Sequence, residues 1–109
     1  MPYSQSLAHR LRDCLDRYPH ILEKKMFGGL GFLLNGNMLI GVWKEYLVLR
    51  LGVAQATEAL KQEHVKAFDV TGKPLSGWVM IAEDDIDDDL DLKQWLSQAM
   101  EFVGTLPGK

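Results

Sequence analysis

The chain has little of what marks secreted, membrane-spanning or disulfide-stapled proteins. It contains a single cysteine, Cys14, among 109 residues, so it cannot form an internal disulfide and suits a reducing compartment. Its N-terminus is charged by position 10 and lacks the apolar segment of a signal peptide. No apolar run approaches the roughly 20 residues that a membrane-spanning helix needs. We therefore expect a cytoplasmic protein that makes no contact with a membrane.

An excess of positive charge is missing as well. The net charge is −3 and the pI is about 5.5, whereas domains that bind nucleic acid usually neutralise phosphates with clustered lysines and arginines. Direct contact with nucleic acid is therefore disfavoured. One group of cations near the first expected helix keeps it open as an alternative function: Arg10, Arg12, Arg17, Lys24 and Lys25. The simpler interpretation of this group is a solvated helix face.

Metal-binding patterns are also absent. His9, His20 and His64 are too far apart in sequence for a zinc site. The stretch 83–91 contains seven carboxylates in nine positions, but a calcium loop that began at Asp85 would place Leu90 where glycine is required. Acidic residues at the start of a helix stabilise its dipole, and we interpret this stretch in that way. We expect no metal and no cofactor.

No recognisable catalytic motif is present. The glycines at 28, 29 and 31 lack the GxGxxG spacing of a phosphate loop, and a strand continues where a helix would have to begin. Cys14 has no activating neighbour and lies on the apolar side of its helix, which predicts a small buried hydrophobic side chain. We expect a protein that is not an enzyme. A small-ligand site or a cryptic enzyme in a pocket beside the glycine strand is a weaker alternative.

What is present is the composition of an ordinary globule, with 47% hydrophobic and 25% charged residues, and we expect a single domain over 1–109. The predicted order is α-β-β-β-α-β-β-α, an α+β fold in two layers with an antiparallel five-stranded sheet. Residues 20–25 are interpreted as a connector. The expected helices are 4–18, capped by Ser4 or Ser6, then 53–62, and a long one from Asp87 onward; the strands after the meander are 65–70 and 78–82, with a turn at 71–74 between them.

The stretch 24–51 predicts a three-stranded antiparallel meander. Asn35-Gly36 favours a type I′ turn because both residues tolerate positive φ. That turn pairs Leu34 with Asn37 and Leu33 with Met38. By continuation it pairs Gly31 with Ile40 and Gly29 with Val42. A second turn at Lys44-Glu45 would pair Trp43 with Tyr46.

Alternation along these strands sorts the side chains onto two faces. The expected core face is aliphatic, with glycines that admit a helix: Phe27, Gly29, Gly31, Leu33, Met38, Ile40, Val42, Leu47, Leu49 and Leu51. The other face contains Trp, Tyr and Arg, residue types that are enriched at interfaces: Leu30, Phe32, Leu34, Leu39, Gly41, Trp43, Tyr46, Val48 and Arg50. The three helices, or a second subunit, would have to cover this second face.

From that face we select Trp43, Tyr46, Arg50 and Phe32 as predicted partner-binding residues. Arg50 is expected near Trp43 and Tyr46, where it anchors an acidic group of the partner, stacks on an aromatic ring, or pairs with a carboxylate at the sheet rim. The partner is either another protein or a second copy of the chain in a homodimer.

Three segments, KMFGGLGFLL (25–34), NGNMLIGV (35–42) and YLVLRLG (46–52), together with FDVTGKPLSGWVMI (68–81), resemble the N-terminal domain of the TfoX/Sxy family of bacterial competence regulators. The resemblance extends over about residues 7 to 106. It implies a two-layer α/β domain and a role in transcriptional regulation, as a coactivator with a cAMP receptor-type protein in DNA uptake. It supplies no catalytic residues. Many members carry a separate C-terminal helical domain, which has no counterpart in these residues.

Overall fold

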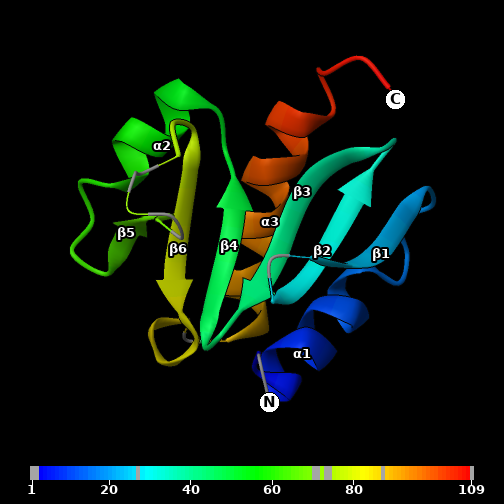
Figure 1. Ribbon diagram of the computed structural model, residues 1–109, viewed down its shortest axis with the longest axis horizontal. Helices are drawn as coiled ribbons and strands as arrows, with labels where there is room; N and C mark the ends of the chain where they lie inside the picture. Colours follow the sequence, from blue (N-terminus) through cyan, green and yellow to red (C-terminus); the bar gives the residue numbers. More distant parts are fainter. Residues whose placement is uncertain (1–2, 27, 70–71, 73–74, 87, 109) are drawn as a thin grey trace.

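The structure is a computed structural model that describes residues 3–26, 28–69, 72, 75–86 and 88–108. In these residues a six-stranded antiparallel sheet packs against three α-helices, in the order α-ββββ-α-ββ-α. Figure 1 shows α1 and α3 behind the sheet, and α2 adds buried alanines to the same core. The strands are β1 (Ile21–Met26), β2 (Gly29–Leu34), β3 (Asn37–Trp43), β4 (Tyr46–Arg50), β5 (Val65–Ala67) and β6 (Trp78–Ala82). The helices are α1 (Gln5–Leu15), α2 (Val53–Ala59), α3 (Asp89–Val103) and a single 3₁₀ turn, η1 (Glu83–Asp85).

The α+β class and the antiparallel sheet are confirmed, but the strand number is six, because the expected connector at 20–25 is strand β1. Its backbone pairs with β2 along its whole length, from Ile21 opposite Leu34 to Met26 opposite Gly29. The spatial order is β1-β2-β3-β4-β6-β5, which makes β1 and β5 the two edges. An edge strand exposes most of its side chains, so β1 lacks the apolar alternation by which a strand is recognised.

The helices begin and end close to the expected positions, for identifiable reasons. Ser4 caps α1, since its Oγ accepts a hydrogen bond from the amide of Leu7 at 3.2 Å. Asp88 caps α3 in the same way, accepting from the amide of Asp91 at 2.9 Å, so this helix starts later than expected. The expected start at Asp87 lies outside the described residues. Helix α2 ends at Ala59, three residues before its predicted end.

The strands beyond α2 agree with expectation in part. Strand β6 has the predicted bounds, Trp78–Ala82, whereas β5 ends at Ala67 rather than at residue 70, which lies outside the described residues. Of the predicted turn at 71–74, only Gly72 is described, and it has a φ of 89°. Strand β6 joins β4 on one side and β5 on the other.

The hairpin at Asn35-Gly36 is confirmed, with φ values of 53° and 84°, and so are the pairs Leu34–Asn37, Leu33–Met38 and Trp43–Tyr46. The two remaining predicted pairs are wrong. A β-bulge shifts the register after Leu33, so that Phe32 faces Ile40 and Gly31 faces Gly41. Strand β3 carries Leu39 as an extra residue, and both Leu39 and Ile40 are fully buried in the core.

Because of the bulge, the side chains of β2 lie on the opposite faces of the sheet from those predicted. The helix-covered core takes Leu30 and Phe32 from this strand, together with Leu39, whereas Gly31, Leu33 and Met38 lie on the opposite side. The expected core positions Ile40, Val42, Leu47, Leu49 and Leu51 are confirmed. Phe32 is only 2% exposed. The prediction that Phe32 lies on the aromatic face is therefore wrong, and Phe27 lies outside the described residues.

Candidate protein-interaction surface

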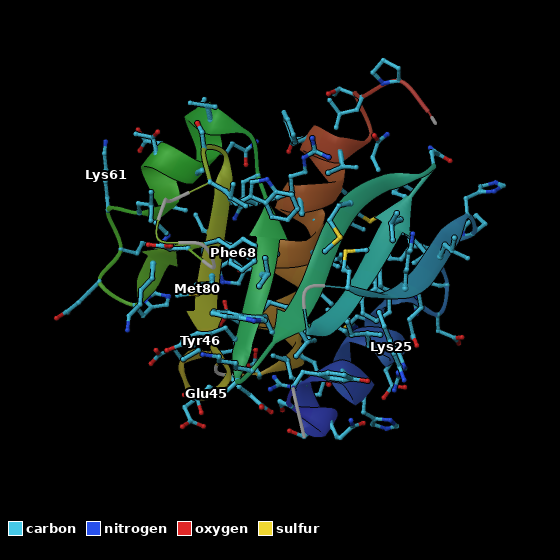
Figure 2. The ribbon with its side chains drawn as sticks, viewed as in Figure 1. Lys25, Glu45, Tyr46, Lys61, Phe68 and Met80 are labelled. Carbon is cyan, nitrogen blue, oxygen red and sulfur yellow. The ribbon has the colours of Figure 1, made fainter. Side chains whose placement is uncertain are left out.

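The sheet surface turned away from the helices carries both apolar and charged side chains, and we call it the open face. Figure 2 views the molecule from this side, with Tyr46, Phe68 and Met80 in front of the sheet. The strand register assigns to this face, or places beside it, Lys24, Met26, Gly31, Leu33, Met38, Gly41, Trp43, Tyr46, Val48, Arg50, Lys66, Phe68, Trp78 and Met80. No helix covers it in the part of the chain that the structure describes.

Four aromatic side chains form a continuous row on this face, the aromatic cluster: Trp43, Tyr46, Phe68 and Trp78. Trp43 and Tyr46, opposite each other on β3 and β4, stack with ring centroids 6.3 Å apart. Phe68 bridges the two tryptophans, since its centroid is 5.8 Å from that of Trp43 and 5.9 Å from that of Trp78. Such ring pairs stabilise a fold beyond the area they bury, by about 0.5–1.5 kcal/mol each.

The aromatic cluster forms a second, smaller apolar layer. Val48 on β4 is fully buried and Phe68 is 3% exposed, yet neither belongs to the core cluster beneath the helices. Trp43, Tyr46 and Trp78 stay half-buried, with part of each ring surface in solvent. Phe68 therefore shields the centre of the open face and leaves aromatic surface exposed around it.

Two cations lie over the rings. The Nζ of Lys44 is 4.6 Å from the centroid of Trp43, and the Cζ of Arg50 is 5.6 Å from that of Trp78. Arg50 was expected near Trp43 and Tyr46, but it lies at the other end of β4, opposite Trp78. The guanidinium of Arg50 thus lies over an aromatic ring of its own chain, although the ring is a different one from those expected. No described carboxylate forms an ion pair with it.

The other half of the open face is built from glycine and methionine. Gly31 and Gly41 are direct neighbours on β2 and β3. A Cβ atom on Gly31 would lie 2.9 Å from the sulfur of Met26 and 3.0 Å from the terminal methyl of Met38. The glycines were expected to admit a helix on the core face. They instead make room for two methionine side chains on the open face.

The cations predicted as a nucleic-acid patch are divided by the fold. Arg12 on α1 donates two hydrogen bonds to Glu23 on β1, at 2.7 and 3.0 Å. This pairing raises the pKa of Arg12 and lowers that of Glu23. Arg10 pairs with Asp89 at 3.2 Å. Two of the five cations are thus neutralised by carboxylates on the helical side, and Lys24 belongs to the open face.

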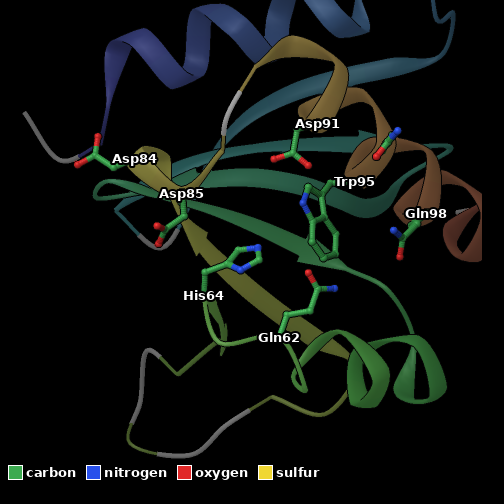
Figure 3. Close-up of a pocket in the computed structure, with 8 residues that line it drawn as sticks. Gln62, His64, Asp84, Asp85, Asp91, Trp95 and Gln98 are labelled. Carbon is green, nitrogen blue, oxygen red and sulfur yellow. The ribbon is translucent and has the colours of Figure 1, made fainter.

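The acidic stretch borders a polar hollow of about 460 Å³ between α3, η1 and the segment before β5. Figure 3 shows His64, Asp84 and Asp85 across from Asp91, Trp95 and Gln98. Among the described residues, no group of three or more histidine, cysteine or acidic side chains is arranged to hold a metal ion. Cys14 is buried as expected, and burial raises the pKa of its thiol.

The structure brings Trp43, Tyr46 and Arg50 to one face, as predicted, and removes Phe32 from it. Sequence reasoning missed Phe68, Trp78 and Lys44. Alternation along 78–82 would have placed Trp78 on one side with Met80. For Phe68, which follows the last residue of β5, the sequence carries no comparable signal.

None of the described helices is long and apolar enough to cross a membrane.

Comparison with known families gives one match. The family model for the TfoX N-terminal domain covers residues 13–103, from the last turn of α1 to the last residue of α3. No curated protein and no solved structure matches the chain.

Proposed function

The chain belongs to the TfoX N-terminal domain family, and we propose that it is a non-enzymatic domain that binds a protein partner through the open face. The family is associated with competence regulation and is generally regulatory rather than catalytic. We place the protein's role in the transcriptional control of competence, in the cytoplasm. The partner in this proposal is a regulatory protein rather than a second copy of the chain.

The observation that carries the proposal is the one-sided packing of the sheet. Trp43, Tyr46 and Trp78 are partly exposed on a face that no described helix covers, while Lys44 and Arg50 lie over two of the rings. Aromatic and arginine side chains are enriched at protein interfaces and supply a large share of binding energy there. A helix-free face with these residue types is suited to a partner's surface.

The test is affinity capture from the native cell with the wild-type chain and with Trp43→Ala and Arg50→Glu, each checked for folding by circular dichroism. Tyr18→Ala and Arg17→Glu are the matched controls, because both residues are exposed and lie outside the open face. We expect the two open-face variants to lose the wild-type partner and the two controls to keep it. Identical partners for all five chains would contradict the proposal.

Sedimentation of the same five proteins separates the alternatives. A concentration-dependent dimer that Trp43→Ala dissolves would show that the open face binds a second copy instead of a regulatory protein. Retention of DNA or RNA by the wild-type chain that weakens steeply with salt, and that is lost in Arg17→Glu, would favour the nucleic-acid alternative.

A further inference from the structure

We infer that the partner segment bound by the open face is acidic and amphipathic, with carboxylates that meet four cations of this face, Lys24, Lys44, Arg50 and Lys66, which form no ion pair with a described carboxylate. This inference rests on the proposed function and adds the chemistry of the partner. It follows from the distribution of charge between the two sides of the sheet.

The strand positions on the open face carry cations and no carboxylate within the described residues. Lys24 lies opposite Gly31, Lys66 opposite Met80 and Arg50 opposite Trp78, so all three point to this side. Lys44 adds a fourth cation from the β3–β4 turn. In the described segments that adjoin these positions, Glu45 in that turn and Asp69 after Phe68 supply carboxylates at the border of the face.

These four cations have no carboxylate partner among the described residues, although Arg50 donates a hydrogen bond to the carbonyl of Met38 at 3.5 Å. No described carboxylate forms an ion pair with Lys24, Lys44, Arg50 or Lys66. On the helical side, Arg10 and Arg12 are both held by carboxylates. A protein with a net charge of −3 thus presents one locally positive, apolar surface. Complementary potentials of this kind select a partner and accelerate the encounter.

The cations that cover the aromatic rings favour binding of a protein segment over binding of single-stranded nucleic acid. Nucleic-acid platforms on sheets stack bases on open ring faces. Here the ring of Trp43 lies beneath Lys44, and that of Trp78 lies beneath Arg50. Phe68 is 3% exposed. The surface therefore offers ammonium and guanidinium groups above aromatic rings, which suits carboxylates flanked by apolar side chains.

The test measures binding of fluorescent probes to the full chain by anisotropy. One probe is a peptide of about 16 residues in which Asp and Glu alternate with Leu and Phe, and its twin carries Lys in place of the acids. A thymidine oligonucleotide of similar length is the third. The test variant is Lys24→Glu with Lys66→Glu, and the control is Arg17→Glu with Lys93→Glu, an equal charge change at exposed residues outside the open face.

We expect the acidic peptide to bind at least about ten-fold more tightly than either of the other two probes. Its affinity should fall as the salt concentration rises from about 50 to about 300 mM. The Lys24/Lys66 variant should lose about ten-fold in affinity, while the control variant binds as the wild type does. Equal binding of the lysine twin, stronger binding of the oligonucleotide, or an unchanged Lys24/Lys66 variant would each overturn the inference.

Two results distinguish this inference from the function on which it rests. If no probe binds while capture of the native partner still requires Trp43, the open face is an interaction surface but its partner is not acidic. If capture does not require Trp43, the proposed function and the inference are both wrong.

Discussion

Arg50 and Trp78 face each other across β4 and β6, and the guanidinium carbon lies 5.6 Å from the centre of the indole ring. The pair links β4 to β6, the strand that lies next to the edge strand β5. It also sets the position of the only arginine on the described open face.

We expect a measurable coupling between these two residues. In a double-mutant cycle of Arg50→Met and Trp78→Leu, the coupling free energy of unfolding should be about 0.5–1 kcal/mol in favour of the native pair. Urea unfolding of the four proteins measures it. Lys66→Met with Trp78→Leu is the control cycle, for which we expect no coupling. Strict additivity in the first cycle would show that the stacked geometry contributes nothing to stability.

The two neighbouring glycines of the open face should differ in their tolerance of a methyl group. At Gly41 an added Cβ would lie 2.7 Å from the backbone oxygen of Leu30, which cannot move aside, so Gly41→Ala should destabilise by about 1–3 kcal/mol. At Gly31 the close atoms belong to flexible methionine side chains, so Gly31→Ala should cost less than about 1 kcal/mol. Urea midpoints compare the two, and the reverse order would contradict the prediction.

The pair between Arg12 and Glu23 makes stability depend on pH. The hydrogen bonds from Arg12 lower the pKa of Glu23 in the folded protein. A group of this kind contributes stability above its unfolded pKa and loses it as the pH falls through its folded pKa. Glu23→Gln should therefore cost up to about 1 kcal/mol at pH 7, since both side chains are partly exposed.

That difference should shrink as the solution is acidified, because Glu23 of the wild type then becomes protonated. Chemical unfolding at a series of pH values measures the trend. Glu101→Gln, at an exposed position on α3 without an ion pair to a described residue, is the control. A loss that stays constant down to pH 3 would show that the charge of Glu23 is not its cause.

Asn37 ties the tip of the β2–β3 hairpin to the C-terminal segment. Its Nδ2 donates a hydrogen bond to the carbonyl of Pro107 at 2.9 Å, and the residue is 3% exposed. Asn37→Ala removes this hydrogen bond and should cost about 0.5–1.5 kcal/mol. Asn35→Gly, in the exposed turn of the same hairpin, should be nearly neutral. Thermal unfolding and amide exchange at 104–106 compare them, and equal losses would contradict the assignment.

The local structure was predictable where a residue pattern is compatible with only one local conformation. Asn35-Gly36 tolerates positive φ at two successive positions, which identified the β2–β3 hairpin and the register nearest to its turn. The strand Trp78–Ala82 was equally clear, and the cap of the first helix was narrowed to Ser4 or Ser6, of which Ser4 is the cap. These features depend on a few adjacent residues and not on the rest of the fold.

The errors arose where a choice depends on packing. Residues 38–42 are apolar or glycine throughout, so alternation could not decide whether Leu39 or Ile40 enters the core, and the structure buries both. Phe32 changed faces in consequence. Trp78 lies beside Arg50, and Phe68 lies beside Trp43, because the spatial order of the strands is β4-β6-β5. No local sequence pattern specifies that order.

The two edges of the sheet bear on aggregation. A long, apolar edge strand can pair with a strand of another molecule, and an apolar sheet face beside it increases the risk of aggregation. Strand β5 has three residues, and β1 carries Glu23, Lys24 and Lys25 in succession along its exposed length. These charges disfavour edge-to-edge growth into a fibril. A chain with Lys24 and Lys25 replaced by valine would keep the same fold and lose this protection, so its solubility would fall before its stability did.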